Sequence, residues 1–546
     1  MKKFIFGLVC LPVFILSCKN NPFKDHKKPI EVDKTITKKT SFNNLFIDSN
    51  TIHSFLHDHP EFEKFSEQYI DFYKLRNYQC AWFDSSGISE QAYNFMNLAA
   101  NAVSVYNDSS LYNKQLAKIV DVFKADTSKV MVRTAPNVVE TELKLTGHFF
   151  LYASKVFKGA DINIEELGWY IPRKKIDLTA LLDSVIANKN GIDTTKLPVN
   201  SAYKKLLNFL PVYRNIEQSL AWDSIAYPEQ SLHKGISDRT IATIKERLFA
   251  LGDLPVNDST PVFDSALFAA AKNFQARMGL GVDGVIGTSF IKQLNITPAK
   301  RIEQILVNLE RLRWMPPITD STLIIVNIPE YKMYVYNNGH LDFNMNVIVG
   351  ASATGTVIFT GNLKYVVFNP YWNVPQSIVE KEILPGIQQN KDYLTIHHME
   401  VFGSYSKDVP AIRQLPGPDN ALGKVKFLFP NNFDIYFHDT NNRNAFNASK
   451  RNLSHGCIRL SEPKKLAMYL LSYDTTTYSS YNVDSLMNLD KEKWVTLKKP
   501  VPVMISYYTA FVDAKGRLNL RNDIYKHDSA MAAKLFTPNI DTTAKP

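Results

Sequence analysis

The hydrophobic periodicity of the chain changes near Thr322, and this change constrains the fold more than any other feature. Before it, apolar residues recur at helical spacing in several stretches, for example Phe62–Tyr73 and Leu143–Phe157. After it, short runs rich in β-branched and aromatic residues follow one another, and Asn338-Gly339 between two of them is a strong hairpin signal. The sequence therefore predicts a multidomain α+β protein with a helical first part and a mostly-β second part.

At roughly 100–200 residues per domain, a chain of 546 residues suggests about three domains. In chain order we expect a helical scaffold, a small three-helix module, a mostly-β domain and a C-terminal extension with a frayed tail after about residue 530. Their expected bounds are 42–230 with a continuation at 297–318, then 231–296, 319–510 and 511–546.

Cap and stop residues punctuate the small module. Ser237 and Asp264 are predicted to cap two helices, Gly252 and Gly279 to end them, and Thr288 to open a third. Three short helices leave little room for a pocket, so we expect a binding role for this module rather than a catalytic one.

The N-terminus has the features of an export signal. Lys2 and Lys3 precede the apolar run Phe4–Leu16, which is shorter than the roughly 20 residues that span a bilayer. Small Ser17 before Cys18 resembles a lipoprotein box, so residues 1–18 are expected to be a signal peptide with Cys18 as the lipid attachment site. An ordinary signal with a chance cysteine is the alternative. Polar residues 19–41 would then be a tether.

The net charge of +10 suits an anionic partner, although a solvated basic surface is the favoured explanation. We find no basic run interleaved with aromatic residues, so nucleic acid is not expected as a partner. Of four cysteines, only Cys80 and Cys457 lie outside the signal segment, which is too few for a disulfide scaffold. A bridge between them is possible by count alone, but it would consume the thiol of the motif described next.

One motif carries chemistry. A predicted strand, Phe433–Phe437, leads into His438, and Ser454-His455-Gly456-Cys457-Ile458-Arg459 follows. A thiol is a weak nucleophile until it ionises, and we expect the imidazole to lower its pKa and carry its proton. Gly456 permits backbone conformations closed to other residues, so that the N–H groups of Gly456 and Cys457 can face a developing oxyanion.

This constellation resembles the catalytic signature of the L,D-transpeptidase family. Tyr371–Pro375 and Pro416–Gly423 resemble segments of its large periplasmic members, in which the intervening region, here about 376–424, caps the substrate cleft. Phe274-Gln275 and Asp283–Gly287 resemble parts of a peptidoglycan-binding module. The resemblance covers about residues 42 to 525 and is weakest in the first helical region.

The resemblance implies that Cys457 is the nucleophile and His438 its base, oriented by the backbone carbonyl of the next residue, here Asp439. A side-chain role for Asp439 stays open. Four further residues each have two possible roles. His455 holds the loop or titrates, and Arg459 binds a stem-peptide carboxylate or forms a structural ion pair. Tyr436 lines the oxyanion site or packs, and Trp372 forms a wall of the cleft or fills a core. Ser454 matches the motif.

The implied reaction is acyl transfer on peptidoglycan stems and glycan strands through a Cys457 thioester, with release of D-Ala and formation of 3→3 cross-links. Hydrolysis by an L,D-carboxypeptidase, attachment of a protein amine, and a catalytically silent wall-binding lipoprotein are the alternatives. No cofactor or metal is expected, and the pair His397-His398 is interpreted as a solvated loop. Carbapenems are expected inhibitors. The protein would be exported, anchored to a membrane by its lipid and facing the periplasm, with the outer membrane as the expected location.

Overall fold

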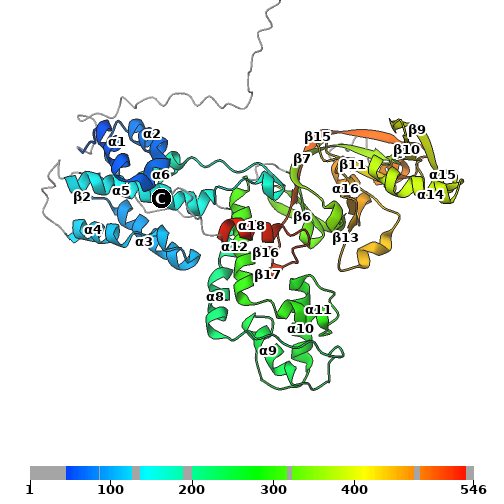
Figure 1. Ribbon diagram of the computed structural model, residues 1–546, viewed down its shortest axis with the longest axis horizontal. Helices are drawn as coiled ribbons and strands as arrows, with labels where there is room; N and C mark the ends of the chain where they lie inside the picture. Colours follow the sequence, from blue (N-terminus) through cyan, green and yellow to red (C-terminus); the bar gives the residue numbers. More distant parts are fainter. Residues whose placement is uncertain are drawn as a thin grey trace, which may run out of the picture.

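The computed structural model describes residues 45–84, 86–125, 136–188, 200–316, 322–472 and 480–536. The predicted signal peptide, Cys18 and the tether lie outside these residues. The described chain is a multidomain α+β protein. In Figure 1 the N-terminal helices (blue to cyan) lie at one end, the β-rich part at the other, and the small helical module below their junction. None of the helices in these ranges is long and apolar enough to span a membrane.

The N-terminal helices pack around an aromatic core. Their bounds are Ser49–Asp58 (α1), Ser66–Leu75 (α2), Glu90–Tyr106 (α3), Lys114–Ala125 (α4), Pro136–Ala153 (α5) and Leu178–Ala187 (α6). The buried carboxylate of Glu142 on α5 accepts hydrogen bonds from the backbone N–H groups of Ala81 (2.6 Å) and Trp82 (2.9 Å) and from the Tyr73 hydroxyl (3.0 Å). These bonds fix the irregular segment that separates α2 from α3.

Helices α7 (Ser201–Leu207), α8 (Phe209–Ser219) and α12 (Pro298–Trp314) lead into and out of the small module. The module contains α9 (Thr240–Ala250), α10 (Ser265–Met278) and α11 (Thr288–Leu294). Asp264 caps α10 as predicted, accepting from the N–H of Leu267, and Gly279 ends it in a left-handed conformation. The predicted cap Ser237 is wrong, because the Asp238 carboxylate accepts the N–H of Thr240 at the start of α9.

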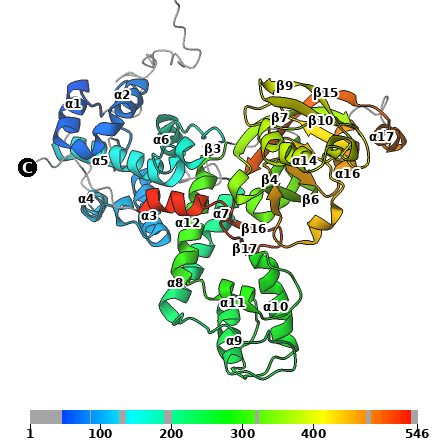
Figure 2. The ribbon, with the colours of Figure 1, turned by 45° about the vertical axis from the view of Figure 1, so that its right-hand side comes forward.

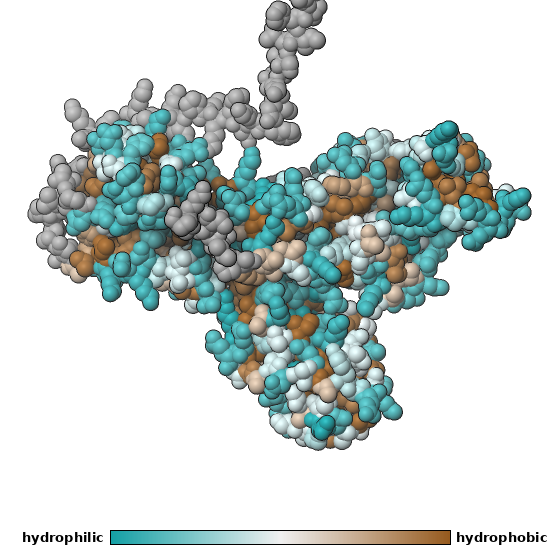
Figure 3. All heavy atoms as spheres, viewed as in Figure 1, coloured by the Kyte–Doolittle hydropathy of each residue, from teal (hydrophilic) through white to brown (hydrophobic). Residues whose placement is uncertain are grey.

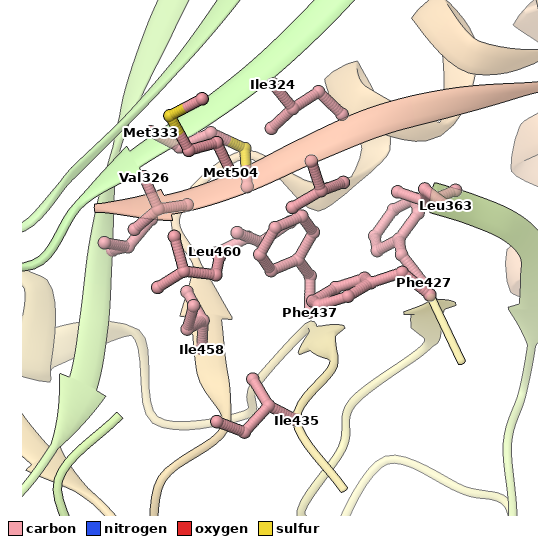
Figure 4. Close-up of a cluster of buried hydrophobic side chains, with 14 of the residues drawn as sticks. Ile324, Val326, Met333, Leu363, Phe427, Ile435, Phe437, Ile458, Leu460 and Met504 are labelled. Atoms are coloured by element: carbon pink, nitrogen blue, oxygen red, sulfur yellow. The ribbon is translucent and has the colours of Figure 1, made fainter. Parts of the chain in front are cut away.

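The β-rich part is a sheet that closes on itself. Ten strands of the described chain belong to it: β3 (Trp169–Tyr170), β4 (Thr322–Asn327), β5 (Lys332–Asn337), β6 (His340–Gly350), β7 (Ile358–Phe368), β11 (Val425–Leu428), β12 (Phe437–His438), β13 (Asn452–Ser454), β14 (Ile458–Leu460) and β15 (Lys493–Ser506). Their order is β11-β12-β14-β6-β5-β4-β15-β7-β3, and β11 also pairs with β7, which completes a ring. Apolar side chains fill the ring, among them Phe437, Ile458 and Leu460 (Figure 4).

Of two predictions for this region, one is wrong in detail and one is confirmed. The strand expected over Phe433–Phe437 is reduced to Phe437–His438, because Asp434 has a φ of +54° and the Asn431 side chain binds the backbone of Phe433 (2.9 Å) and Ile435 (2.8 Å). The expected hairpin is present, with Asn338 and Gly339 both at positive φ.

The sheet also recruits chain from outside the β-rich region. Strand β3 comes from the segment predicted as helical scaffold, and it pairs in parallel with the start of β7. The tail predicted to fray after residue 530 is ordered to Phe536: helix α18 (His527–Phe536) packs beside α12, and Met531 is 1% exposed (Figure 2). We call residues 507–536, with β16 (Ala510–Val512), β17 (Leu518–Leu520) and α18, the C-terminal strap.

Residues 372–414 form a small subdomain at the rim of the sheet, which we call the cap. It holds a three-stranded sheet of β8 (Trp372–Asn373), β10 (Val409–Gln414) and β9 (Met399–Ser406), with the short helices α13 (Gln376–Ile378), α14 (Leu384–Gln389) and α15 (Tyr393–Ile396) and the π-helix Val379–Ile383. Figure 3 shows apolar atoms at the surface over the β9–β10 end of the cap. Ile396, Val401 and Phe402 are exposed large apolar side chains of this subdomain.

Candidate active site

Two neighbouring parallel strands bring the predicted nucleophile and base together. In the pairing of β12 with β14, Phe437 lies opposite Ile458 and His438 opposite Arg459. The N–H of Ile458 donates to the carbonyl of Tyr436 at 3.1 Å. Cys457 directly precedes β14, so its side chain emerges next to β12, while the buried rings and aliphatic groups of both strands anchor them to the core (Figure 4).

A cavity of about 1000 Å³ opens above these strands. Its walls come from three places: the ends of β12 and β14, the loop after β6, and the cap. Of the catalytic and substrate-binding residues predicted from the sequence, all but Asp439 line it, namely Trp372, Tyr436, His438, Ser454, His455, Gly456, Cys457 and Arg459. Among the residues that the structure describes, no three His, Cys, Asp or Glu side chains gather as metal ligands.

The position of His438 defines its tautomer. Its Nδ1 lies 2.6 Å from the carbonyl oxygen of Asp439, and because a carbonyl can only accept, Nδ1 carries the proton. Burial, with the nearby Arg459 charge as a second cause, lowers the pKa of His438 to about 3. The imidazole is therefore neutral at pH 7, and Nε2 is left with a free lone pair, as a general base requires.

The thiol of Cys457 is half-buried, and its Sγ donates to the carbonyl of Asp434 at 3.5 Å. Burial raises the pKa of Cys457, and hydrogen bonds from Tyr436 offset only part of this shift. The thiol pKa is therefore raised rather than lowered as expected, because burial outweighs these hydrogen bonds. The resting pair is a neutral thiol beside a neutral imidazole.

Backbone hydrogen bonds shape the loop that carries the thiol. The Ser454 hydroxyl donates to the Cys457 carbonyl (2.6 Å) and accepts the Gly456 N–H (3.2 Å). Gly456 has a φ of +124°, which other residues rarely adopt. The Gly456 N–H is thus already used, contrary to expectation, whereas no described residue accepts the N–H of Cys457. The loop offers the Cys457 N–H as its oxyanion donor.

Asp439 plays a structural part with its side chain. The residue is buried, with 3% of its surface exposed. Its carboxylate accepts hydrogen bonds from the N–H groups of Lys424 (2.9 Å) and Thr440 (2.6 Å) and forms an ion pair with Arg443. A Cβ on Gly423 would lie 2.5 Å from the Asp439 carboxyl carbon. The backbone carbonyl of Asp439 accepts from His438, and the hydrogen bonds of the side chain hold that carbonyl in place.

His455 turns away from the thiol toward the cap. Its Nε2 lies 3.1 Å from the carboxylate of Glu382, on the π-helix of the cap, and both side chains are more than half exposed. This contact joins the loop of the nucleophile to the cap across the cavity. It favours a positional role for His455 over one in proton transfer.

Tyr436 and Arg459 flank the thiol. The Tyr436 ring lies 5.8 Å from the His438 ring, and burial, followed by the neighbouring Cys457, raises the pKa of its hydroxyl. The Nε of Arg459 is buried and has no hydrogen-bond partner among the described residues. A cation that lines the cavity with an unsatisfied donor is suited to a ligand carboxylate.

Trp372 combines both roles considered for it, because it lines the cavity and packs against the small apolar core of the cap. Cys80 is a buried residue of the helical core. The sequence interpretation missed Asp434, Thr354 and Thr356. Asp434 sits in a turn that resembled a strand, and the two threonines come from a loop that has no catalytic residue type in it.

Comparisons with known proteins agree with this geometry. Residues 321–501 match the YkuD family, the L,D-transpeptidase catalytic domain; residues 67–210 match a scaffold domain; and residues 237–294 match a family described as "Putative peptidoglycan binding domain". A Haemophilus influenzae protein named "Putative L,D-transpeptidase" is 33% identical over 252 residues, which cover 43% of this chain and 49% of that protein. The chain thus spans about half the length of this relative.

Solved structures with partial likeness include an L,D-transpeptidase from Stackebrandtia nassauensis (12% identity, 52% of this chain and 97% of that chain, TM-score 0.21). Another is L,D-transpeptidase 3 from Mycobacterium tuberculosis (14% identity, 34% of this chain and 61% of that chain, TM-score 0.19). The family assignment rests on the sequence matches rather than on these superpositions. Residues 321–501 of this chain are therefore a catalytic domain of the L,D-transpeptidase family.

Proposed function

We propose that the chain is a peptidoglycan L,D-transpeptidase that forms 3→3 cross-links through a thioester on Cys457. The observation that carries the proposal is the arrangement at the ends of β12 and β14. A neutral imidazole with a free Nε2, a thiol, and an unused Cys457 N–H belong to two residues that line one cavity. A base, a nucleophile and an oxyanion donor are the parts that acyl transfer needs.

In the first half-reaction, Nε2 of His438 accepts the thiol proton while Sγ of Cys457 attacks the carbonyl carbon between diaminopimelate and the terminal D-Ala of a tetrapeptide stem. The carbonyl oxygen takes up the electron pair beside the Cys457 N–H. As the C–N bond breaks, the imidazolium returns its proton to the departing D-Ala amine. The products are a thioester and free D-Ala, and His438 is neutral again.

In the second half-reaction, the side-chain amine of a diaminopimelate on another stem attacks the thioester. His438 accepts a proton from this amine and passes it to the departing Cys457 thiolate, so no group is consumed. The cavity volume of about 1000 Å³ is in the size range of sites that hold extended ligands, which is compatible with two stems. Arg459 is our candidate for binding a stem-peptide carboxylate.

The test is incubation of the purified protein with muropeptides that carry tetrapeptide stems, followed by mass spectrometry. Wild type and a Cys80→Ala control should release D-Ala and form 3→3 dimers, whereas folded Cys457→Ala should form none. Product formation by Cys457→Ala would refute the mechanism. Tripeptides without dimers would identify an L,D-carboxypeptidase, in which water resolves the same thioester.

We propose further that residues 231–296 bind the glycan strands or stems of the wall, and that Cys18 carries a lipid that anchors the protein, facing the periplasm, with the outer membrane as the expected location. The motivation is the family match of residues 237–294 and the position of Cys18 after the apolar run. Intact mass of the membrane-extracted protein should show an acylated chain that begins at Cys18. A chain that keeps residues 1–17 would contradict the lipid anchor.

A further inference from the structure

The C-terminal strap reaches the active site from outside the matched catalytic domain. The domain match ends at residue 501, and Tyr525 of the strap lies beyond it. The Tyr525 hydroxyl donates to the carbonyl of Gly350 at 2.5 Å and accepts the N–H of Thr356 at 3.3 Å. Gly350 is the last residue of β6, and Thr356 lies in the loop that follows it and forms one wall of the cavity. One phenol therefore ties the two ends of this loop together.

The loop itself is closely folded. A Cβ on Gly350 would lie 2.1 Å from the carbonyl oxygen of Thr354, so the chain turns back on itself with no room for a side chain. The N–H of Gly350 donates to the Thr356 hydroxyl at 2.9 Å. Thr356 is 1% exposed, and its hydroxyl has one remaining proton to donate.

That proton goes to the nucleophile loop. The Thr356 hydroxyl donates to the carbonyl of Gly456 at 2.6 Å, and the Thr354 hydroxyl donates to the carbonyl of Ser454 at 3.1 Å. In a trans peptide the C=O and N–H bonds point in opposite directions. A donor that holds the Gly456 carbonyl therefore also sets the direction of the Cys457 N–H, which is the unused donor of the proposed oxyanion site.

The strap is rigid enough to act as a support. The N–H of Tyr525 donates to the Tyr507 hydroxyl (2.9 Å), which donates to the Asp523 carboxylate (2.7 Å). The other oxygen of Asp523 accepts the N–H of Asp528 at the start of α18 (3.0 Å), and Asp528 pairs with Arg311 of α12 (2.5 Å). Tyr525 is thus held at both its backbone and its hydroxyl.

We infer that Tyr525 is a positioning residue for the acyl transfer: through Thr356 it aims the Cys457 N–H at the oxyanion that forms on the substrate carbonyl. The inference rests on the proposed function. It predicts a selective defect. Acylation, which builds charge on a carbonyl oxygen, depends on the aim of this N–H. Alkylation of the same sulfur by iodoacetamide, in which an S–C bond forms and iodide leaves, does not.

The experiment compares full-length wild type with Tyr525→Phe, which keeps the ring and removes the hydroxyl. The control is Tyr508→Phe in the same strap, because the buried Tyr508 hydroxyl has no hydrogen-bond partner among the described residues. For each protein the rate of Cys457 acylation by imipenem and the rate of its alkylation by iodoacetamide are followed by intact mass.

Tyr525→Phe should acylate roughly 10-fold more slowly, because small misplacements of catalytic groups cost one to two orders of magnitude in rate. Its alkylation and the two rates of Tyr508→Phe should match wild type. Thr356→Val should show a larger selective loss, and Thr356→Ser, which restores the hydroxyl, should recover most of it.

Acylation of Tyr525→Phe at the wild-type rate would overturn this inference alone. Equal losses in acylation and alkylation would also overturn it, because they would indicate a change in thiol access or folding. A wild-type protein that iodoacetamide alkylates at Cys457 but imipenem does not acylate would refute the proposed function itself.

Discussion

Replacement of His438 by alanine tests the two opposed pKa shifts around the nucleophile. Burial lowers the pKa of His438 to about 3 and raises the pKa of the Cys457 thiol, so both groups are neutral at pH 7 before substrate arrives. In the proposed mechanism the imidazole of the wild-type protein takes the thiol proton during the attack, so no preformed thiolate is required. In His438→Ala the thiol must ionise without a partner.

The size of the effect follows from the fraction of thiolate. A thiol whose pKa is raised above its ordinary value of about 8.5 to 9 is ionised to about 1% or less at pH 7. General bases contribute about 10²–10⁴ in rate, and we therefore expect acylation of His438→Ala to be at least about 100-fold slower than wild type at pH 7. The variant should gain about tenfold for each pH unit as the thiolate fraction rises.

The acylation rate of the wild-type protein should depend on pH differently from that of His438→Ala. The base stays unprotonated until the pH approaches about 3, so the acylation rate should be flat from pH 8 down to about pH 5. The assay is the rate of carbapenem adduct formation over this pH series, read by intact mass, with Cys80→Ala as a control for the second thiol.

Three results would refute the reasoning. A wild-type rate that falls with an apparent pKa near 6.5 would mean that His438 titrates as an ordinary histidine. Acylation of His438→Ala at the wild-type rate near pH 7 would remove His438 as the base. An adduct on Cys80 would show that the nucleophile is wrongly assigned.

Three more predictions follow from the geometry. Gly456→Ala should slow acylation about 100-fold, because alanine disfavours the φ of +124° at this position and the strained backbone would turn the Cys457 N–H away from the oxyanion. Single-turnover acylation rates would measure this loss. Glu382→Gln should raise the KM for muropeptides but change thermal stability by less than about 1 kcal/mol in calorimetry, since its contact with His455 is solvent-exposed. The folded-state pKa of His438 lies below the unfolded value of about 6.5, so the unfolded chain takes up a proton first as the pH falls. Between pH 7 and pH 4.5, urea unfolding should therefore show wild type losing about 3 kcal/mol more than His438→Gln.

The sequence predicted those parts of the site that are encoded locally. Cys457, Gly456 and Ser454 lie within a few positions of one another, and the strand that ends at His438 is short and apolar, so spacing and residue type sufficed. The same local reasoning failed at Asp434, where alternating apolar residues resemble a strand but the Asn431 side chain binds the backbone and bends it.

Contacts between residues far apart in the sequence could not be predicted from local sequence patterns. Tyr525 and Thr356 are 169 positions apart, and neither stands in a motif. Strand β3 looked like part of a helical region, because two residues are too few to show a period. The direction of the Cys457 pKa shift could not be predicted from the sequence either, since its largest cause is burial, which only the folded chain defines.

The strap has a consequence for how the protein is made. The ribosome synthesises His438 and Cys457 well before Tyr525. A nascent chain would therefore already contain its proposed base and nucleophile while the loop after β6 still lacks the hydrogen bonds of the Tyr525 hydroxyl. The oxyanion donor would acquire its final direction only when the strap docks beside α12. Full catalytic power would then require synthesis of the strap, and a chain that stops before Tyr525 would keep the signature motif but work slowly.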